Sequence, residues 1–361
     1  MKEVDTMPVS AIIHGEHVSR FTHYASRMLL SASMPQINKD APYLIGIDIG
    51  GTKLAVVVAD RHGQVIQKVR RLTEAMRGPD AVVRMLCEMS RDVMALASVS
   101  TEEVAGIGVS CGGPLDTSTG IVYSPPNLPD WEAVPLKAWL EEELQLAAYI
   151  ENDANAGALA EWLFGAGRGY QTLVYMTMST GIGGGLILDG RLFRGPGDVA
   201  GEVGHMTIVA DGPKCGCGKY GCLEALCSGP SIARRARELL QTEPASFMLK
   251  LTDGNSDLVT AKTVMDAARQ DDPAALQIVN ETARYMAIGL GNIVNILNPQ
   301  IIIIGTILVK AHDLLLAPIR DYLRRETWER VYDLVQIVPA ELGDAVGDLA
   351  AIAVIQQKLA G

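Results

Sequence analysis

The sequence predicts an α/β fold of two lobes around a central cleft, each lobe built from a sheet and helices. The chain has 361 residues, more than one ordinary domain of about 100–200 residues needs. Strand-like runs alternate with helical runs, which is typical of helices packed on a mixed sheet. A strand, a glycine turn and a second strand open both halves of the chain, which indicates an internal duplication.

Composition and charge narrow the class of protein. The net charge is −11, so no basic field attracts nucleic acid or anionic lipid, and we expect neither as a partner. The longest apolar run, residues 301–304 and 307–309, is broken at 305–306 and is far shorter than the about 20 residues of a membrane helix. Three of the six cysteines cluster and no secretory signal is evident, so we expect metal chemistry in a reducing cytoplasm.

The first lobe is predicted from residues 43–150 with 345–361. Residues 1–42 lack sustained periodicity, so we expect a poorly packed extension, or equally a surplus upstream start of translation. Three strands separated by short turns, 43–49, 53–60 and 64–71, predict an antiparallel meander. Two helix-to-strand pairs follow, and the strands at 104–110 and 147–151 should run parallel to the first strand.

The second lobe is predicted from residues 151–344. It opens with strands at 172–179 and 185–188 around a glycine turn. Helical spacing then predicts helices at 228–241, 273–297 and 313–327, with buried strands at 300–304 and 334–339. A last helix at 348–359 should cross back onto the first lobe.

Residues 48–53 join two predicted strands through a turn that suits an anion. Gly50 and Gly51 let backbone amides approach a phosphate, and Thr52 and Lys53 can donate to its oxygens. Two glycines alone are equally typical of a plain tight hairpin. Asp48 favours a nucleotide, because a carboxylate beside a phosphate loop can hold the Mg²⁺ that accompanies ATP.

A second glycine turn, residues 180–185, has glycine at four of its last five positions. A simple hairpin needs fewer. We expect Thr180 and Gly181 to form a second phosphate contact, and a purely structural turn is the alternative.

Asn152 and Asp153 stand where a predicted strand ends and a helix begins. Asp153 could cap the helix, which is the commoner role of an aspartate at that position. It could also be a general base, because strand ends of α/β sheets face the ligand. We favour the base, since phosphoryl transfer needs a carboxylate that orients the acceptor hydroxyl.

One imidazole and three thiols have the spacing of a metal site: His205, Cys215, Cys217 and Cys222. Glycines between them let a short loop, 205–224, fold around one ion. The four ligands predict a closed tetrahedral Zn²⁺ site with a structural role, because no position is left open for water.

Carboxylates and amides near this loop suggest a polyol ligand. Glu202 and Glu224 flank the cluster, so a bound zinc would bring both carboxylates to one place. Gly112, after a strand, and Asn127, in a proline-rich loop, could contact the same ligand. Taken singly, each glutamate is more often a solvated charge, and such loops are usually only loops.

These elements together resemble the ROK family (repressors, open reading frames and kinases), and most of all its bacterial glucokinases. The resemblance covers about residues 43–361 and rests on the motifs at 202–205, 215–224 and 46–53. It implies a two-lobed actin-like ATPase (ribonuclease H-like) fold with a duplicated core. It also implies ATP-dependent phosphorylation of a hexose, with glucose converted to glucose 6-phosphate.

The resemblance also implies roles for individual residues. Asp153 would be the catalytic base, and His205 would bind zinc through one ring nitrogen and sugar through the other. Further sugar-binding residues would be Asn127, Asn152, Glu202 and Glu224. Nucleotide-binding residues would be Gly50, Gly51, Thr52, Thr180, Gly181 and Gly305.

Several alternatives stay open at this point. The sugar could be N-acetylglucosamine, N-acetylmannosamine, mannose or fructose, and polyphosphate could replace ATP. The family usually has two glycines where this chain has Gly305-Thr306, and this difference would affect the affinity for the nucleotide. A sugar-responsive repressor would need an N-terminal helix-turn-helix, which residues 1–42 do not convincingly supply. The family resemblance suggests a homodimer or homotetramer.

Overall fold

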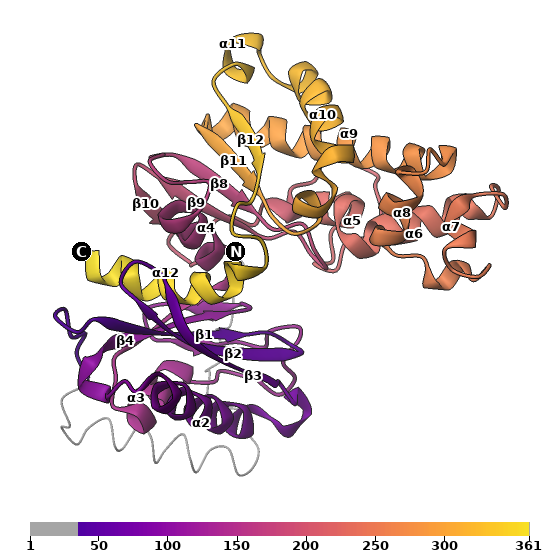
Figure 1. Ribbon diagram of the computed structural model, residues 1–361. Helices are drawn as coiled ribbons and strands as arrows, with labels where there is room; N and C mark the ends of the chain where they lie inside the picture. The colour runs from indigo at the N-terminus through magenta and orange to yellow at the C-terminus, as the bar shows by residue number, and fades with distance from the viewer. Residues whose placement is uncertain (1–34, 361) are drawn as a thin grey trace, which may run out of the picture. The chain divides into compact units, whose positions relative to one another are not determined.

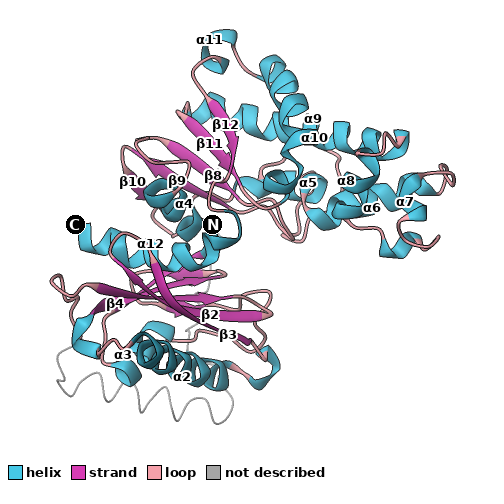
Figure 2. Cartoon of the chain, viewed as in Figure 1, coloured by secondary structure: helices cyan, strands magenta, loops and turns pink. Residues whose placement is uncertain are grey.

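The computed structural model describes residues 35–360. Its first sheet has five strands in the order β3-β2-β1-β4-β7 (Figures 1 and 2). β1, β2 and β3 form the predicted antiparallel meander, and β4 and β7 run parallel to their neighbours. The strands are β1 (Tyr43–Ile49), β2 (Lys53–Asp60), β3 (Val65–Leu72), β4 (Val104–Cys111) and β7 (Ala148–Asn152).

The second sheet repeats this arrangement with the order β10-β9-β8-β11-β12. Its first three strands are again antiparallel, and its last two are parallel. The same strand order and directions confirm the predicted duplicated core. The strands are β8 (Leu173–Met176), β9 (Gly184–Leu188), β10 (Arg191–Phe193), β11 (Ile301–Ile304) and β12 (Gln336–Pro339).

Helices α2 (Pro79–Ala97) and α3 (Leu136–Leu144) supply the crossovers of the first sheet. Their apolar faces share one core with β1, β2 and β4, and Trp131 is fully buried there. A short hairpin of β5 (Leu115–Asp116) and β6 (Ile121–Val122) follows β4. The loop from 123 to 135 then returns the chain to α3.

The last helix, α12 (Val346–Ala360), packs on parts of both halves of the chain. Ile352 and Ile355 share a core with the first sheet, whereas Ala350 and Ala353 pack with α4 (Asp153–Phe164) and the second sheet (Figure 1). Gly108 permits this approach, because a Cβ there would lie 2.0 Å from the carbonyl oxygen of Ala351. The prediction that the last helix returns to the first sheet is confirmed.

The remaining helices form a second large core with the other face of the second sheet. The longest begins at a side-chain cap: the carboxylate of Asp272 accepts a hydrogen bond from the backbone N–H of Ala275, and Asn298 ends the helix in the left-handed conformation. These helices are α5 (Leu223–Cys227), α6 (Gly229–Leu240), α7 (Phe247–Lys250), α8 (Ala261–Ala268), α9 (Pro273–Leu297), α10 (Ile307–Glu326) and α11 (Glu329–Tyr332).

The predicted N-terminal extension lies mostly outside the described residues. Its last part is packed, since Ala41 is buried and the backbone N–H of Asn38 donates to the carbonyl of Ala105. The packed chain thus begins before residue 43. The lobe limits near residues 150 and 344 stay a prediction, with β7 continuing in the first sheet to Asn152. Within residues 35–360, no helix is both long and apolar enough to cross a membrane.

Candidate active site

The first glycine turn joins β1 to β2 and is braced from β3. The hydroxyl of Thr73 donates to the carbonyl of Gly50 at 2.6 Å, and the backbone N–H of Thr73 donates to the carbonyl of Thr52 at 3.1 Å. A Cβ at Gly51 would lie 2.5 Å from Cβ of Asn127. Only glycine therefore lets this turn touch the loop that carries Asn127. Thr52 and its neighbour Lys53 are exposed beside it.

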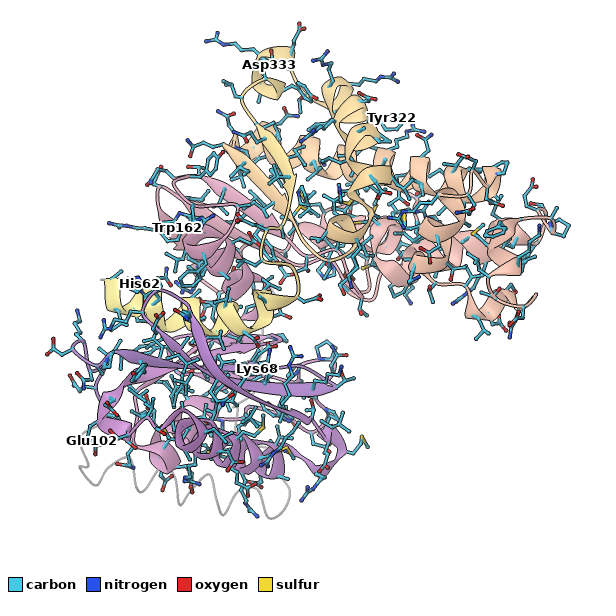
Figure 3. The ribbon with its side chains drawn as sticks, in the orientation of Figure 1. His62, Lys68, Glu102, Trp162, Tyr322 and Asp333 are labelled. Carbon is cyan, nitrogen blue, oxygen red and sulfur yellow. The ribbon has the colours of Figure 1, made fainter. Side chains whose placement is uncertain are left out.

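Asp48 is the last residue but one of β1, just before this turn. Burial raises the pKa of its carboxyl group to about 6, with further contributions from the negative charges of Asp348 and Asp153. Lys68, which is labelled in Figure 3, opposes the rise and forms an ion pair with Asp348. The hydroxyl of Ser110 also hydrogen-bonds Asp48. This cluster carries excess negative charge, which favours a bound cation.

Asn152 and Asp153 connect β7 to α4. The structure makes Asn152 the N-cap, because its side-chain oxygen accepts from the backbone N–H of Ala154 at 3.0 Å. Asp153 is the first residue of the helix and accepts from the same N–H at 2.8 Å. Solvent reaches Asp153, but the protein atoms around its carboxyl group raise its pKa by desolvation, and the charge of Glu202 adds to the rise. Asn152 rather than Asp153 is thus the N-cap residue, although the carboxylate of Asp153 also accepts a hydrogen bond from the helix.

The second glycine turn joins β8 to β9 and is braced by Glu224. One carboxylate oxygen of Glu224 accepts from the backbone N–H of Ile182 at 2.9 Å. A Cβ at Gly181 would lie 2.6 Å from the same oxygen. Thr180 is exposed at the tip of the turn. Glu224, which the sequence predicts to bind the sugar, thus also supports the turn that is predicted to bind phosphate.

Gly305 and Thr306 lie beside this second turn, between β11 and α10. The backbone N–H of Gly305 donates to the carbonyl of Met176 at 2.8 Å. Thr306 has φ 55° and ψ −101°, which is unusual for a β-branched residue. Its hydroxyl oxygen accepts from the backbone N–H of Met178 at 2.9 Å, which compensates part of the strain.

The predicted metal ligands converge. The ligand atoms of His205, Cys215, Cys217 and Cys222 all lie within 4.8 Å of one another. Nδ1 of His205 is 3.6 Å from Sγ of Cys215, and Sγ of Cys217 is 3.7 Å from Sγ of Cys222. Tetrahedral zinc, with bonds of about 2.3 Å to sulfur and 2.0–2.1 Å to nitrogen, requires separations close to these. The donor set therefore fits zinc.

The metal-ligand cluster also meets the predicted sugar residues. Nε2 of His205, the ring nitrogen that faces away from the thiols, lies 3.7 Å from a carboxylate oxygen of Glu202. The other carboxylate oxygen of Glu224 lies 3.7 Å from Sγ of Cys215. After β4, a Cβ at Gly113 would lie 3.1 Å from Nδ2 of Asn152. Gly113, the neighbour of the predicted Gly112, therefore lies close to Asn152.

Sequence reasoning missed the residues that support the site. Lys68 in β3, Thr73 just after β3 and Asp348 in α12 belong to no motif, and no local signal could have found them. Glu151 and Arg194 form an ion pair in which Glu151 is only 1% exposed. A glutamate within an otherwise apolar strand was the visible signal for that pair.

Two sheets of equal strand order, each with a glycine turn after its central strand, define the actin-like ATPase class of fold. Within that class the chain belongs to the ROK family, whose model matches residues 44–358. A glucokinase of Thermotoga maritima is 35% identical over 318 residues, which cover 88% of this chain and 98% of that protein.

The chain is also similar to a glucokinase of known structure and to a repressor. The ROK glucokinase of Streptomyces griseus, in complex with glucose and AMPPNP, superposes with a TM-score of 0.73 at 34% identity, over 87% of this chain and 99% of that chain. A xylose repressor of Bacillus spizizenii is 31% identical, over 85% of this chain and 75% of the repressor. The proteins similar to this chain thus include both glucokinases and a repressor.

Proposed function

We propose that this protein is a sugar kinase that transfers the γ-phosphate of ATP to glucose and forms glucose 6-phosphate. The carrying observation is the position of Asp153. Its carboxyl group interacts electrostatically with Asp48 behind the first glycine turn and with Glu202 beside the metal cluster. A base at that position faces both the phosphate side and the sugar side. The similar glucokinases support the same reaction.

Asp153 would accept the proton of the attacking hydroxyl. Phosphoryl transfer asks such a base mainly to orient the hydroxyl, because the proton leaves late in the reaction. The raised pKa of Asp153 also makes it a better base than an ordinary aspartate. The sugar would be held by Gly112, Asn127, Asn152, Glu202, His205 and Glu224.

ATP would bind where the two glycine turns expose backbone amides. Mg²⁺ at Asp48 would neutralise charge on the phosphate oxygens when it is bound with ATP. We further infer that sugar binding closes the two predicted lobes and expels water, which suppresses ATP hydrolysis. The nucleotide-binding residues would be Asp48, Gly50, Gly51, Thr52, Lys53, Thr180, Gly181 and Gly305.

The cluster of three thiols and His205 would hold a structural Zn²⁺. Four protein ligands leave no open position for a reacting water, so the ion would stabilise the loop rather than take part in the reaction. Its contribution would be to keep Glu202, His205 and Glu224 in their places. The proposed assembly is a homodimer or homotetramer in the cytoplasm.

The choice of sugar and the class of protein have alternatives. N-acetylglucosamine, N-acetylmannosamine, mannose or fructose would fit the same carboxylates and amides, and polyphosphate would use the same turns. Sugar-dependent repression is the second class, supported by the similar xylose repressor. A net charge of −11 and the placement of Asp153 favour the kinase, so we propose no nucleic-acid partner.

A coupled assay of ATP consumption across a panel of monosaccharides tests the proposal. Glucose is expected to give the highest kcat/KM, with ADP formed in equal amount to phosphorylated sugar. If turnover is highest with another sugar, that sugar would be the substrate instead of glucose, and the proposed kinase activity would stand. No turnover with any sugar, together with sugar-dependent binding of operator DNA, would establish the repressor instead.

A further inference from the structure

A buried ion pair next to Asp153 has no part in the proposed chemistry. Glu151 lies in β7, and its side chain is 1% exposed. One of its carboxylate oxygens accepts a hydrogen bond from Nε of Arg194 at 2.7 Å and lies 2.6 Å from Nη2 in an ion pair. Arg194 follows β10 of the second sheet, so the pair ties that sheet to β7 of the first.

The second carboxylate oxygen of Glu151 accepts hydrogen bonds from a residue before and a residue after Asp153 in the chain. It accepts from the backbone N–H of Asn152 at 3.1 Å and from the side-chain amide of Asn155 at 3.0 Å. Both oxygens of this buried carboxylate are therefore hydrogen-bonded. Glu151 thus fixes the start of α4 in relation to Arg194.

Residues 194–201, here called the strap, lead from Arg194 to the residue before Glu202. The strap is anchored at its start by Arg194, in its middle by Asp198 and at its end by Gly201. Nη2 of Arg194 donates to the side-chain oxygen of Gln357 in α12 at 3.2 Å. The carboxylate of Asp198 accepts from the backbone N–H and the hydroxyl of Thr117, both at 2.9 Å.

The end of the strap is packed against β9. A Cβ at Gly201 would lie 2.4 Å from the carbonyl oxygen of Gly184, so the backbones touch where only glycine fits. The strap folds back on itself as well, since the backbone N–H of Ala200 donates to the carbonyl of Arg194 at 2.9 Å. Glu202 follows immediately and interacts with Asp153.

We propose that Arg194 is a positioning residue that fixes Asp153 relative to Glu202. The proposal rests on the proposed kinase function, in which these carboxylates face the same sugar. The guanidinium binds Glu151 next to the base and, through the strap, sets the position of Glu202. Loss of the guanidinium should misplace the hydroxyl relative to the base, which affects sugar turnover more than nucleotide binding.

Replacement of Arg194 tests this. Arg194→Met should lower kcat/KM for glucose by about 100-fold, the effect of a misplacement of about 1 Å, and leave KM for ATP unchanged. Arg194→Lys should restore part of the loss, because it keeps the charge but not the two-pronged contact. The matched control is Arg191→Met, three positions earlier on the exposed side of β10, which should keep wild-type kinetics.

A double variant separates positioning from stability. Arg194→Met leaves Glu151 buried and unpaired, whereas Glu151→Gln with Arg194→Met leaves no unpaired charge and should fold. The double variant is expected to keep the kinetic loss. Wild-type kcat/KM in the double variant would mean that the pair serves stability only, and the proposal would be wrong.

Hydrogen exchange tests the strap without any turnover. In the double variant, the amides of Thr117 and Ala200 should exchange faster than in wild-type protein. Unchanged exchange would contradict the claim that Arg194 holds the strap in place, whatever the kinetic result. Wild-type protein that phosphorylates no sugar would instead refute the kinase function, and the exchange result alone would then decide whether Arg194 holds the strap.

Discussion

The two glycine turns occupy equivalent positions in two sheets of the same topology, but they are supported differently. The turn after β1 is braced by a neutral hydroxyl, that of Thr73 in its own half of the chain. The turn after β8 is braced by a carboxylate, that of Glu224, which lies next to the thiol of Cys215. Duplication has kept the backbone and changed the support.

The difference indicates that the two turns should respond differently to loss of a bound metal ion. A hydroxyl that donates to a carbonyl needs only the strands around it. Glu224 lies beside a loop whose four side chains would hold the proposed ion and would lose their common arrangement without it. We therefore expect metal loss to disturb the second turn and to spare the first.

The largest effect is expected where the two halves meet, at Asp153. Asp153→Asn should lower kcat by about 10²- to 10⁴-fold, because the amide cannot take the hydroxyl proton. Glucose and ATP should still bind, as measured by calorimetry, since neither turn is altered. Asp189→Asn, in the exposed turn between β9 and β10, is the control and should keep full turnover. Retained turnover in Asp153→Asn would refute its role as base.

Metal removal should come next in size. Cys217→Ser, or treatment with a chelator, should release zinc and lower the free energy of unfolding by about 4 kcal/mol if the ion is present at a thousandfold of its Kd. Hydrogen exchange should become faster at Ile182 but not at Thr73, whose backbone N–H donates to the carbonyl of Thr52 in the first turn. Equal acceleration at both turns would contradict the separate supports, and metal analysis showing no bound ion in wild-type protein would contradict the site.

Replacing the two supports themselves sharpens the comparison. Glu224→Ala should cost about 2 kcal/mol, because a charged hydrogen bond to Ile182 is lost, and should raise KM for both ATP and glucose. Thr73→Val should cost about 1 kcal/mol and raise KM for ATP alone. Unfolding by urea and initial-rate kinetics measure both. An identical kinetic pattern in the two variants would show that the supports are interchangeable.

The smallest effect is expected at Thr306. Thr306→Val keeps the strained backbone and loses the hydrogen bond to Met178, so it should cost about 1–1.5 kcal/mol. Thr306→Gly loses the same bond but relieves strain of about 1–3 kcal/mol, so it should be close to neutral or stabilising. Denaturant titrations compare the two variants. A glycine variant less stable than the valine variant would contradict the strained geometry.

Much of the fold could be predicted because its signals are local. The meander from Tyr43, the helix from Pro273 to Leu297 and the glycine turns each depend on a few neighbouring residues. The second turn also revealed the duplication. Boundaries were less predictable: the strand expected at 334–339 begins at Gln336, because hydrogen bonds to β11, rather than β-propensity, define its start.

The site was predictable where residues cluster in the chain and unpredictable where they meet in space. The spacing of His205 and the three cysteines already implied convergence. Nothing in the spacing indicated that Lys68 would pair with Asp348, which lies in the last helix. The hydrogen bond from Ile182 to Glu224 was hidden for the same reason, since it depends on how two loops pack.

One measurement addresses the proposed reaction most directly. Wild-type protein is mixed with Mg-ATP and glucose, and the products are followed by ³¹P NMR. We predict that ADP and glucose 6-phosphate appear in equal amounts and that Asp153→Asn forms neither at a comparable rate. ATP left intact, or ADP accompanied by free phosphate without any sugar phosphate, would contradict phosphoryl transfer to glucose.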